Sequence, residues 1–464
     1  MGVERRDGRE VEGVRTATAE EQAAGVQPAT AAKRAAEIQA RWAWVEPTVW
    51  SARMLTALEN GVKGGKWFSL IDKVYALPNL RAAFAKVKAN AGAAGMDRQT
   101  IEMFENHLEA NLEKLSQELR DGTYRPQPVR RHWIPKPGKA GEQRPLGIPT
   151  VRDRVAQGAV RNVIEPIYEK DFAAHSYGFR PGRGTKDALR RVSELLGEGY
   201  TWVVDADLRS YFDTIPQQRL LERVKQKVSD GRVLGLIQAY LEQPILEELE
   251  QWRPESGTPQ GAVLSPLLSN LYLDPLDHHM AVEGYEMVRY ADDFVVLCRR
   301  EGEAQRALER VQRWVEEVGL ELHPEKTRIA DATGDEGFVF LGYHFKRGMR
   351  FPSKKSLGKL RETLRGKTRR TKGVSLRLVI ENVNRTTRGW FEYFQHAHRN
   401  SFRALDGWVR MRLRSILRKR RGRKGRGRGS DHQRWPNAYF AQHGLYSMTT
   451  ARAERLSVLS KVNH

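Results

Sequence analysis

The sequence has very little cysteine: Cys298 is the only one among 464 residues. A single thiol cannot form an internal disulfide, nor can it supply a zinc site built on clustered cysteines. No apolar run approaches the roughly 18 residues expected of a membrane-spanning helix. The first thirty residues are polar and charged, without the apolar core of a secretory signal. These absences predict a globular, cytoplasmic protein that is long enough for two or three domains.

Acidic residues are scarce in one part of the chain, and this imbalance is more informative than the net charge of +22. Residues 351–430 contain 25 Lys and Arg but only 4 Asp and Glu. Such a run is often a solvated face or a disordered tail. Here, however, apolar residues recur at the spacing of an amphipathic helix: Phe402, Leu405, Val409, Leu413 and Ile416. We therefore expect a folded helical module whose basic face binds a phosphate backbone.

The rest of the pattern predicts an ordered succession of elements. Residues 1–45 have little to bury, so we expect a flexible tail with a short helix at 30–42. Two apolar stretches around a Gly/Lys-rich turn at 130–150 predict a hairpin. Thr185 is placed to cap a helix, and strands and helices then alternate as far as Phe345. This order is typical of an α+β fold built on an antiparallel sheet.

Two adjacent aspartates, Asp292 and Asp293, interrupt an otherwise apolar stretch, 288–297. The flanking residues predict two short strands around a tight turn, and a solvated Asp-Asp tip is one interpretation of such a hairpin. A third acid, Asp207, follows a similar buried strand at 202–204. Carboxylates at the ends of neighbouring strands can converge on a pair of divalent ions and serve phosphoryl transfer. Mg²⁺ suits such oxygen-only ligands.

Three motifs in this order resemble the palm of a reverse transcriptase: VVDADLRSYFD (203–213), GTPQGAVLSPLLSNLYL (257–273) and YADD (290–293). Together with the flanking segments they are most similar to a group II intron-encoded reverse transcriptase, or maturase, of the type that lacks an endonuclease. The resemblance implies a right-hand polymerase, in which fingers and palm precede an α-helical thumb, or X domain. The implied divisions are an N-terminal tail, a helical extension, fingers and palm, thumb, and a basic DNA-binding region: 1–45, 46–125, 126–350, 351–422 and 423–464.

The resemblance also implies the site residues. Asp207, Asp292 and Asp293 would be catalytic and would bind two Mg²⁺ ions. Asp205 lies two residues before Asp207 and should face the same side of a strand, so its participation stays open. Phe212 would exclude a 2′-hydroxyl by its size. The incoming nucleotide would be further contacted by Gln260, Lys136 and Arg144, although Lys139 is close enough to compete with Lys136 for that role.

Nucleic-acid contacts are expected from basic residues of the glycine-rich turn and of the C-terminal module. In the turn, a plain surface role for the two arginines is an open alternative to gripping the template backbone. In the module, packing in the protein interior is an open alternative to nucleic-acid binding for some of the side chains. The expected contacts are Arg180, Arg183, Arg388, Arg412, Arg414, Lys419, Arg420 and Arg421.

The implied function is RNA-directed DNA synthesis coupled to intron splicing and retrohoming. The partners would be the group II intron RNA, an RNA template/DNA primer duplex, target DNA and dNTPs. Suitable Cys or His pairs for a nuclease domain are missing, so target nicking is not expected. Two alternatives stay open. One is a reverse transcriptase of a CRISPR, retron or diversity-generating system, and the other is a non-catalytic RNA-binding splicing factor.

Overall fold

The computed structural model describes residues 28–462 except 136–140, 248–249 and 372. The chain divides into two compact units, 1–65 and 66–464. The described part of the first unit holds α1 (Pro28–Arg41), α2 (Ala52–Asn60) and a short 3₁₀ helix, Lys63–Gly65. Helix α1 matches the expected short helix. Helix α2 begins after Ser51, whose hydroxyl accepts a hydrogen bond from the Met54 amide.

The second unit opens with helices that support the fingers. Helix α7 is buried along almost its whole length, which is typical of a helix at the centre of a domain. Helices α3, α4, α5 and α6 contact it, so their apolar faces are covered by one shared element. The bounds are α3 Ile71–Tyr75, α4 Leu77–Ala89, α5 Ile101–Glu105, α6 Leu108–Asp121 and α7 Val151–Glu169.

The fingers sheet has the strand order β2-β1-β4-β5. Strands β1 (Val129–Pro135) and β2 (Gln143–Ile148) pair antiparallel, which confirms the hairpin expected at 130–150. Strand β4 (Ile245–Glu247) pairs parallel with β1 and antiparallel with β5 (Glu250–Trp252). One strand pair of the fingers therefore departs from the purely antiparallel sheet that the sequence predicts.

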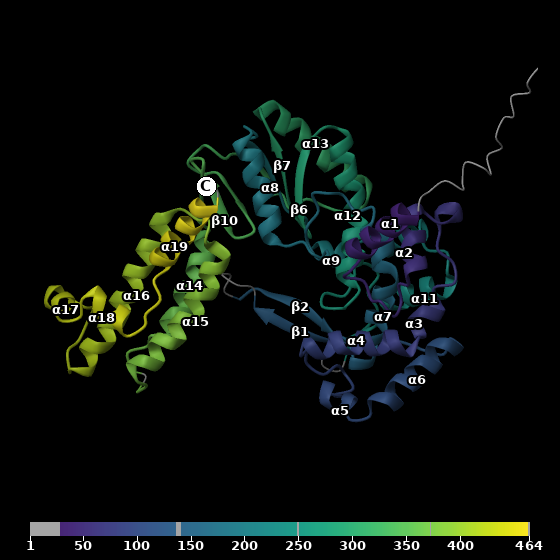
Figure 1. Cartoon of the computed structure of the whole chain (residues 1–464), viewed down its shortest axis with the longest axis horizontal. Helices are drawn as coiled ribbons and strands as arrows, with labels where there is room; N and C mark the ends of the chain where they lie inside the picture. The colour runs from purple at the N-terminus through teal and green to yellow at the C-terminus, as the bar shows by residue number, and fades with distance from the viewer. Residues whose placement is uncertain (1–27, 136–140, 248–249, 372, 463–464) are drawn as a thin grey trace, which may run out of the picture. The chain divides into compact units, whose positions relative to one another are not determined.

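The palm sheet is antiparallel throughout, in the order β6-β7-β3-β8. Helices α8 and α13 flank β6 and β7 (Figure 1), and α12 contacts β6. Helix α8 starts at Thr185, but its N-cap is Gly184, whose amide donates to the Asp187 carboxylate. The cap expected at Thr185 therefore lies one residue earlier. The bounds are β3 Trp202–Ala206, β6 Glu286–Tyr290, β7 Asp293–Cys298, β8 Arg328–Asp331, α8 Thr185–Gly197, α12 Ser265–Val282 and α13 Glu301–Glu317.

Three short helices, α9 (Tyr211–Thr214), α10 (Gln217–Lys225) and α11 (Gly231–Leu241), separate β3 from β4. A third sheet, β11-β10-β9, follows the palm. Its strands lead into the helices of the C-terminal module. The bounds are β9 Phe338–Phe340, β10 Tyr343–Lys346, β11 Met349–Pro352, α14 Lys354–Lys367, α15 Leu376–Phe394, α16 Arg399–Arg420, α17 Gly429–Arg434, α18 Asn437–Gln442 and α19 Met448–Val462.

One buried cluster joins the palm to the C-terminal module. It contains Val203 and Val295 of the palm sheet, Phe345 of the third sheet, and Phe391 and Met448 of the helices. All five residues of the stripe predicted for an amphipathic helix are buried in α16. The α+β architecture with a helical C-terminal region is thereby confirmed. Within the described residues, no helix has the length and apolarity needed to cross a membrane.

Candidate active site

The palm sheet brings the three predicted acids to one edge. Strands β3 and β7 are antiparallel neighbours in which Ala206 pairs with Phe294. Asp207 follows Ala206, and Asp293 precedes Phe294, so both leave the sheet at the same end. Strands β6 and β7 pair Tyr290 with Asp293, which places Asp292 in the two-residue turn between them. Acids about 85 residues apart in the sequence therefore meet where two strands end.

Desolvation first, and mutual repulsion second, disfavour ionisation of the acids at this edge. Desolvation by the surrounding protein raises the pKa of Asp293 to about 6, and the charges of Asp292, Asp207 and Asp205 add to the effect. Desolvation, followed by the charge of Asp207, also raises the pKa of Asp292. A bound cation would stabilise the ionised form of these carboxylates. Its positive charge offsets both the loss of hydration and the repulsion between neighbouring carboxylates.

Two basic side chains partly neutralise the negative charge of these acids. The Lys326 ammonium lies 2.6 Å from Oδ2 of Asp207. Asp205, on β3, has its pKa raised to about 6 by desolvation, against the opposing charge of Arg328. The Arg328 Nε atom lies 3.9 Å from the Asp205 carboxylate. Asp205 and Asp207 both face the same cleft, as their spacing on a strand predicts.

The acids fit a divalent cation by donor type and charge. Within the part of the chain that the structure describes, no three His, Cys, Asp or Glu side chains are arranged closely enough to hold an ion. Oxygen-only ligands with several open positions are what Mg²⁺ prefers.

A cleft of about 950 Å³ opens at this edge. Asp205, Asp207 and Asp293 line it together with residues from β8, β10 and α14. Six Lys and Arg side chains line the same cleft: Lys326, Arg328, Lys346, Lys354, Lys355 and Lys359. A cleft with acids at one point and cations around it suits a polyanion whose reacting phosphate needs a metal.

A second pocket, of about 310 Å³, gathers two of the residues expected to contact a nucleotide. Phe212 and Gln260 both line it, as does Asp213. The Gln260 amide donates to both carboxylate oxygens of Asp213, at 3.2 and 3.1 Å. Asp213 carries no functional assignment from the sequence, yet it holds the side chain that is expected to contact the nucleotide.

The fingers strand β2 forms one wall of this pocket through Pro145 and Gly147. The approach is close: a Cβ atom at Gly261 would lie 2.6 Å from the Gly147 carbonyl oxygen. Arg144 is exposed on β2, next to Pro145. Lys136 and its neighbour Lys139 lie outside the described residues.

Comparisons with known proteins agree with this geometry. Residues 134–345 match the family "Reverse transcriptase (RNA-dependent DNA polymerase)", and residues 357–435 match "Group II intron, maturase-specific domain". The chain is 34% identical over 312 residues to Protein YkfC of Escherichia coli K12, covering 58% of this chain and 81% of that protein. The chain belongs to the group II intron-encoded reverse transcriptases, or maturases.

Two further relatives are longer than the region they share with this chain. The group II intron-encoded protein LtrA of Lactococcus lactis subsp. cremoris is 41% identical over 42% of this chain and 32% of its own length. An uncharacterized 91 kDa protein in the cob intron of Schizosaccharomyces pombe is 27% identical over 68% of this chain and 49% of its own length. The chain thus spans less than half of these two proteins.

The maturase-specific match runs past residue 422, where the sequence places the end of the thumb. Residues 431 and 435 contact helix α16. Arg418 of α16 pairs with Asp431 of α17 at 2.7 Å, and Arg414 donates to the Trp435 carbonyl oxygen at 2.9 Å. Helix α17 is therefore bonded to α16.

Three of the arginines expected to contact nucleic acid have hydrogen-bond partners within the protein. Arg180 is buried and pairs with Glu169, and it also donates to backbone carbonyls. Arg414 is buried and donates to Trp435 and Asn437. Arg412 donates to the Thr368 hydroxyl and carbonyl. Burial and internal hydrogen bonds fit a packing role for Arg180 and Arg414, whereas Arg412 is only half-buried. Nucleic-acid contact by these three residues stays a prediction.

The other expected contacts remain open to solvent to different degrees. Arg183 is half-buried and donates to the Ala174 carbonyl. Arg388 is exposed, with its guanidinium 5.1 Å from the centre of the Tyr446 ring. Lys419, Arg420 and Arg421 are exposed at the end of α16. These residues stay predicted nucleic-acid contacts.

Sequence reasoning missed two groups of site residues. The first comprises the lysines that α14 brings to the cleft, because only tertiary packing places that helix beside the palm. The second is Arg289, one residue before YADD, which is fully buried beneath the turn. A lone arginine in an apolar strand signals a buried carboxylate partner, but the sequence does not say which carboxylate.

Proposed function

We propose that this protein is an RNA-directed DNA polymerase that also binds its group II intron RNA and assists splicing. The observation that carries the proposal is the meeting of Asp207, Asp292 and Asp293 at one end of the palm sheet, beside a cleft lined with cations. Family membership supports the same reaction class. In that reaction the primer 3′-hydroxyl attacks the α-phosphorus of a dNTP, and pyrophosphate leaves.

Different residues would bind the metal ions, select the nucleotide and neutralise the nucleic-acid backbone. Asp207, Asp292 and Asp293 would hold two Mg²⁺ ions, which when bound acidify the primer hydroxyl and neutralise charge on the phosphates. Phe212 would exclude a ribose 2′-hydroxyl, while Gln260, held by Asp213, would orient the nucleotide. Lysines of the cleft would neutralise the backbone of the primer and template strands.

Primer extension on an RNA template with Mg²⁺ tests the proposal. We expect the parent protein to extend the primer with dNTPs, and we expect Asp292→Ala to lose at least about 100-fold in rate, since even a residue outside the ligand sphere of a metal is often worth 10–100-fold. Asp335→Ala is a matched control, because Asp335 lines the same cleft and pairs with Arg347 away from the sheet end. Equal extension by Asp292→Ala and the parent would sink the catalytic assignment.

A splicing assay separates this function from that of a non-catalytic splicing factor. The intron RNA is incubated with the parent or with Asp292→Ala, and spliced exons are counted. Splicing by both proteins, with DNA synthesis by the parent alone, supports the two-function proposal. Splicing without any synthesis by the parent supports a pure RNA-binding factor. Synthesis without intron binding favours a reverse transcriptase of a CRISPR, retron or diversity-generating system.

A further inference from the structure

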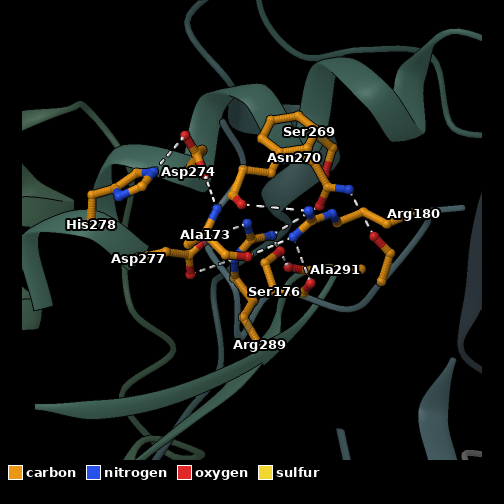
Figure 2. Close-up of polar contacts among 12 residues, drawn as sticks. Ala173, Ser176, Arg180, Ser269, Asn270, Asp274, Asp277, His278, Arg289 and Ala291 are labelled. Atoms are coloured by element: carbon orange, nitrogen blue, oxygen red, sulfur yellow. Dashed lines mark hydrogen bonds and ion pairs between the residues drawn. The ribbon is translucent and has the colours of Figure 1, made fainter. Parts of the chain in front are cut away.

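We propose that Arg289 is a positioning residue: held by Asp277 and Asn270 of helix α12, it fixes the turn that carries Asp292 and Asp293. This inference rests on the polymerase function proposed above and deepens it. Figure 2 shows the residues involved, gathered between α12, the loop that contains Ser176, and the β6–β7 turn. The proposal links a buried ion pair to the direction of the catalytic acids.

The first observation is the complete burial of the Arg289 charge. A guanidinium removed from water needs a paired carboxylate and further hydrogen-bond partners. Asp277 supplies the carboxylate, with its two oxygens 2.8 and 2.9 Å from the Arg289 Nε atom. Asn270 accepts from Nη1 at 2.9 Å. Helix α12 therefore holds Arg289, near the end of strand β6, through two residues that lie about two turns apart on the helix.

The second observation is the hydrogen bond from the guanidinium to the backbone of the β6–β7 turn. Arg289 Nη1 also donates to the Ala291 carbonyl oxygen at 2.9 Å (Figure 2). Ala291 is the residue before Asp292 and has a φ of 60°, a left-handed conformation that is uncommon for a residue with a side chain. Such a conformation persists only where its surroundings enforce it. The bond from Arg289 is one such constraint.

A third element closes over the same turn. A Cβ atom at Gly178 would lie 2.1 Å from the Ala291 amide nitrogen, so the loop backbone packs directly against the turn. The Asn270 amide donates to the Gly178 carbonyl oxygen at 2.7 Å. Asn270 thus binds both the arginine below the turn and the glycine beside it. Helix α12 therefore acts on the turn through two intermediaries, Arg289 and Gly178.

The geometry requires arginine rather than any cation. Its planar fork presents donors toward Asp277, Asn270 and Ala291 at the same time, whereas a lysine ammonium is a compact point charge. A lysine at this position could keep the ion pair with Asp277, yet it would not span all three partners. The substitution Arg289→Lys therefore separates charge compensation from control of the turn.

The test measures metal binding, catalysis and folding for Arg289→Lys. The matched control is Arg310→Lys, whose parent side chain pairs with Glu283 of the same region at 3.5 Å and is partly exposed. We expect Arg289→Lys to bind a primer–template duplex as the parent does. Its kcat and its affinity for Mn²⁺, measured by electron paramagnetic resonance, should each fall by about 10-fold or more, in line with other residues that orient metal ligands. The control should match the parent in all three.

A folded Arg289→Lys variant with parental kcat and Mn²⁺ affinity would overturn the proposal. If Arg289→Lys does not fold, Gly178→Ala provides the test, since it displaces the turn without altering any charge. Loss of Mn²⁺ affinity in Gly178→Ala supports control of the acids by the turn, and unchanged affinity refutes it. If the parent lacks polymerase activity, the proposed function fails, while the Mn²⁺ titration still decides whether Arg289 positions the acids.

Discussion

At the scale of single residues, the acids of the palm edge are the most informative feature. Asp205 and Asp293 both have a pKa raised to about 6 by desolvation. A carboxyl group whose folded-state pKa exceeds its ordinary value binds its proton more tightly when the protein is folded. Its contribution to stability is therefore present at low pH and is lost as pH rises through about 6. Without metal, these acids destabilise the fold at neutral pH.

The loss of stability with rising pH predicts how Asp293→Asn changes the unfolding temperature. In the presence of a chelator at pH 8, we expect the variant to unfold at a higher temperature than the parent, by about 1–2 °C, because one repulsive charge is gone. The difference should vanish near pH 4, where the parent carboxyl group is protonated. Calorimetry at both pH values measures this. A variant less stable than the parent at pH 8 would contradict the assignment of mutual repulsion.

At the scale of elements, α16 separates the two roles of the C-terminal module along one helix. Its apolar stripe and Arg414 face the interior, while Lys419 at its end is exposed. The helix therefore combines a packing face, which stabilises the module, with a basic end that is available to a nucleic-acid backbone.

Two substitutions in α16 should dissociate these roles. Leu413→Ala should lower the free energy of unfolding by about 2–5 kcal/mol through the cavity it leaves, measured by urea denaturation. Lys419→Ala should leave stability nearly unchanged. It should instead weaken RNA binding and reduce the dependence of log affinity on log salt by about 1, as expected for one phosphate contact. If Lys419→Ala destabilises the protein as much as Leu413→Ala, the assignment of Lys419 to the exposed, nucleic-acid-binding end of the helix is wrong.

At the scale of the whole molecule, the distribution of charge predicts how the protein finds its partner. The net charge of +22 is concentrated in residues 351–430, with 25 basic and 4 acidic residues. Affinity for intron RNA should therefore fall steeply with salt, by about 10³-fold or more between 50 and 200 mM for a protein that makes six or more phosphate contacts. Fluorescence anisotropy measures the slope. A flat salt dependence would show that the basic face does not bind the backbone.

Much of this fold was predictable because its signals are local. The short apolar stretches on either side of Asp292 and Asp293 predict the β6–β7 hairpin, and the spacing from Phe402 to Ile416 predicts the buried stripe of α16. The parallel pairing of β1 with β4 was not predictable, since its partners, Val129 and Ile245, are 116 residues apart. A strand carries no sequence signal for the direction of such a distant neighbour.

The burial and the ion-pair partners of the charged residues were harder to predict. Arg180 lies in a glycine-rich turn that favours exposure, yet it is buried against Glu169, eleven residues earlier. Arg289 stands in an apolar strand, and only the packing of α12 supplies Asp277 as its partner. A charged side chain is stable wherever compensation is available, and that depends on which elements meet in space.

The sequence by itself determined many of the elements, the α+β class and the basic C-terminal module, because each is expressed in short-range periodicity or composition. The resemblance of its motifs to a reverse transcriptase palm singled out the three acids. The tertiary structure alone decided that Asp207 and Asp293 lie at the same end of adjacent strands, that α14 brings lysines to the cleft lined by these acids, and that Arg289 donates to Ala291 in the β6–β7 turn. The physical reason is that these relations depend on contacts between residues far apart in the chain, which are set by the packing of whole elements.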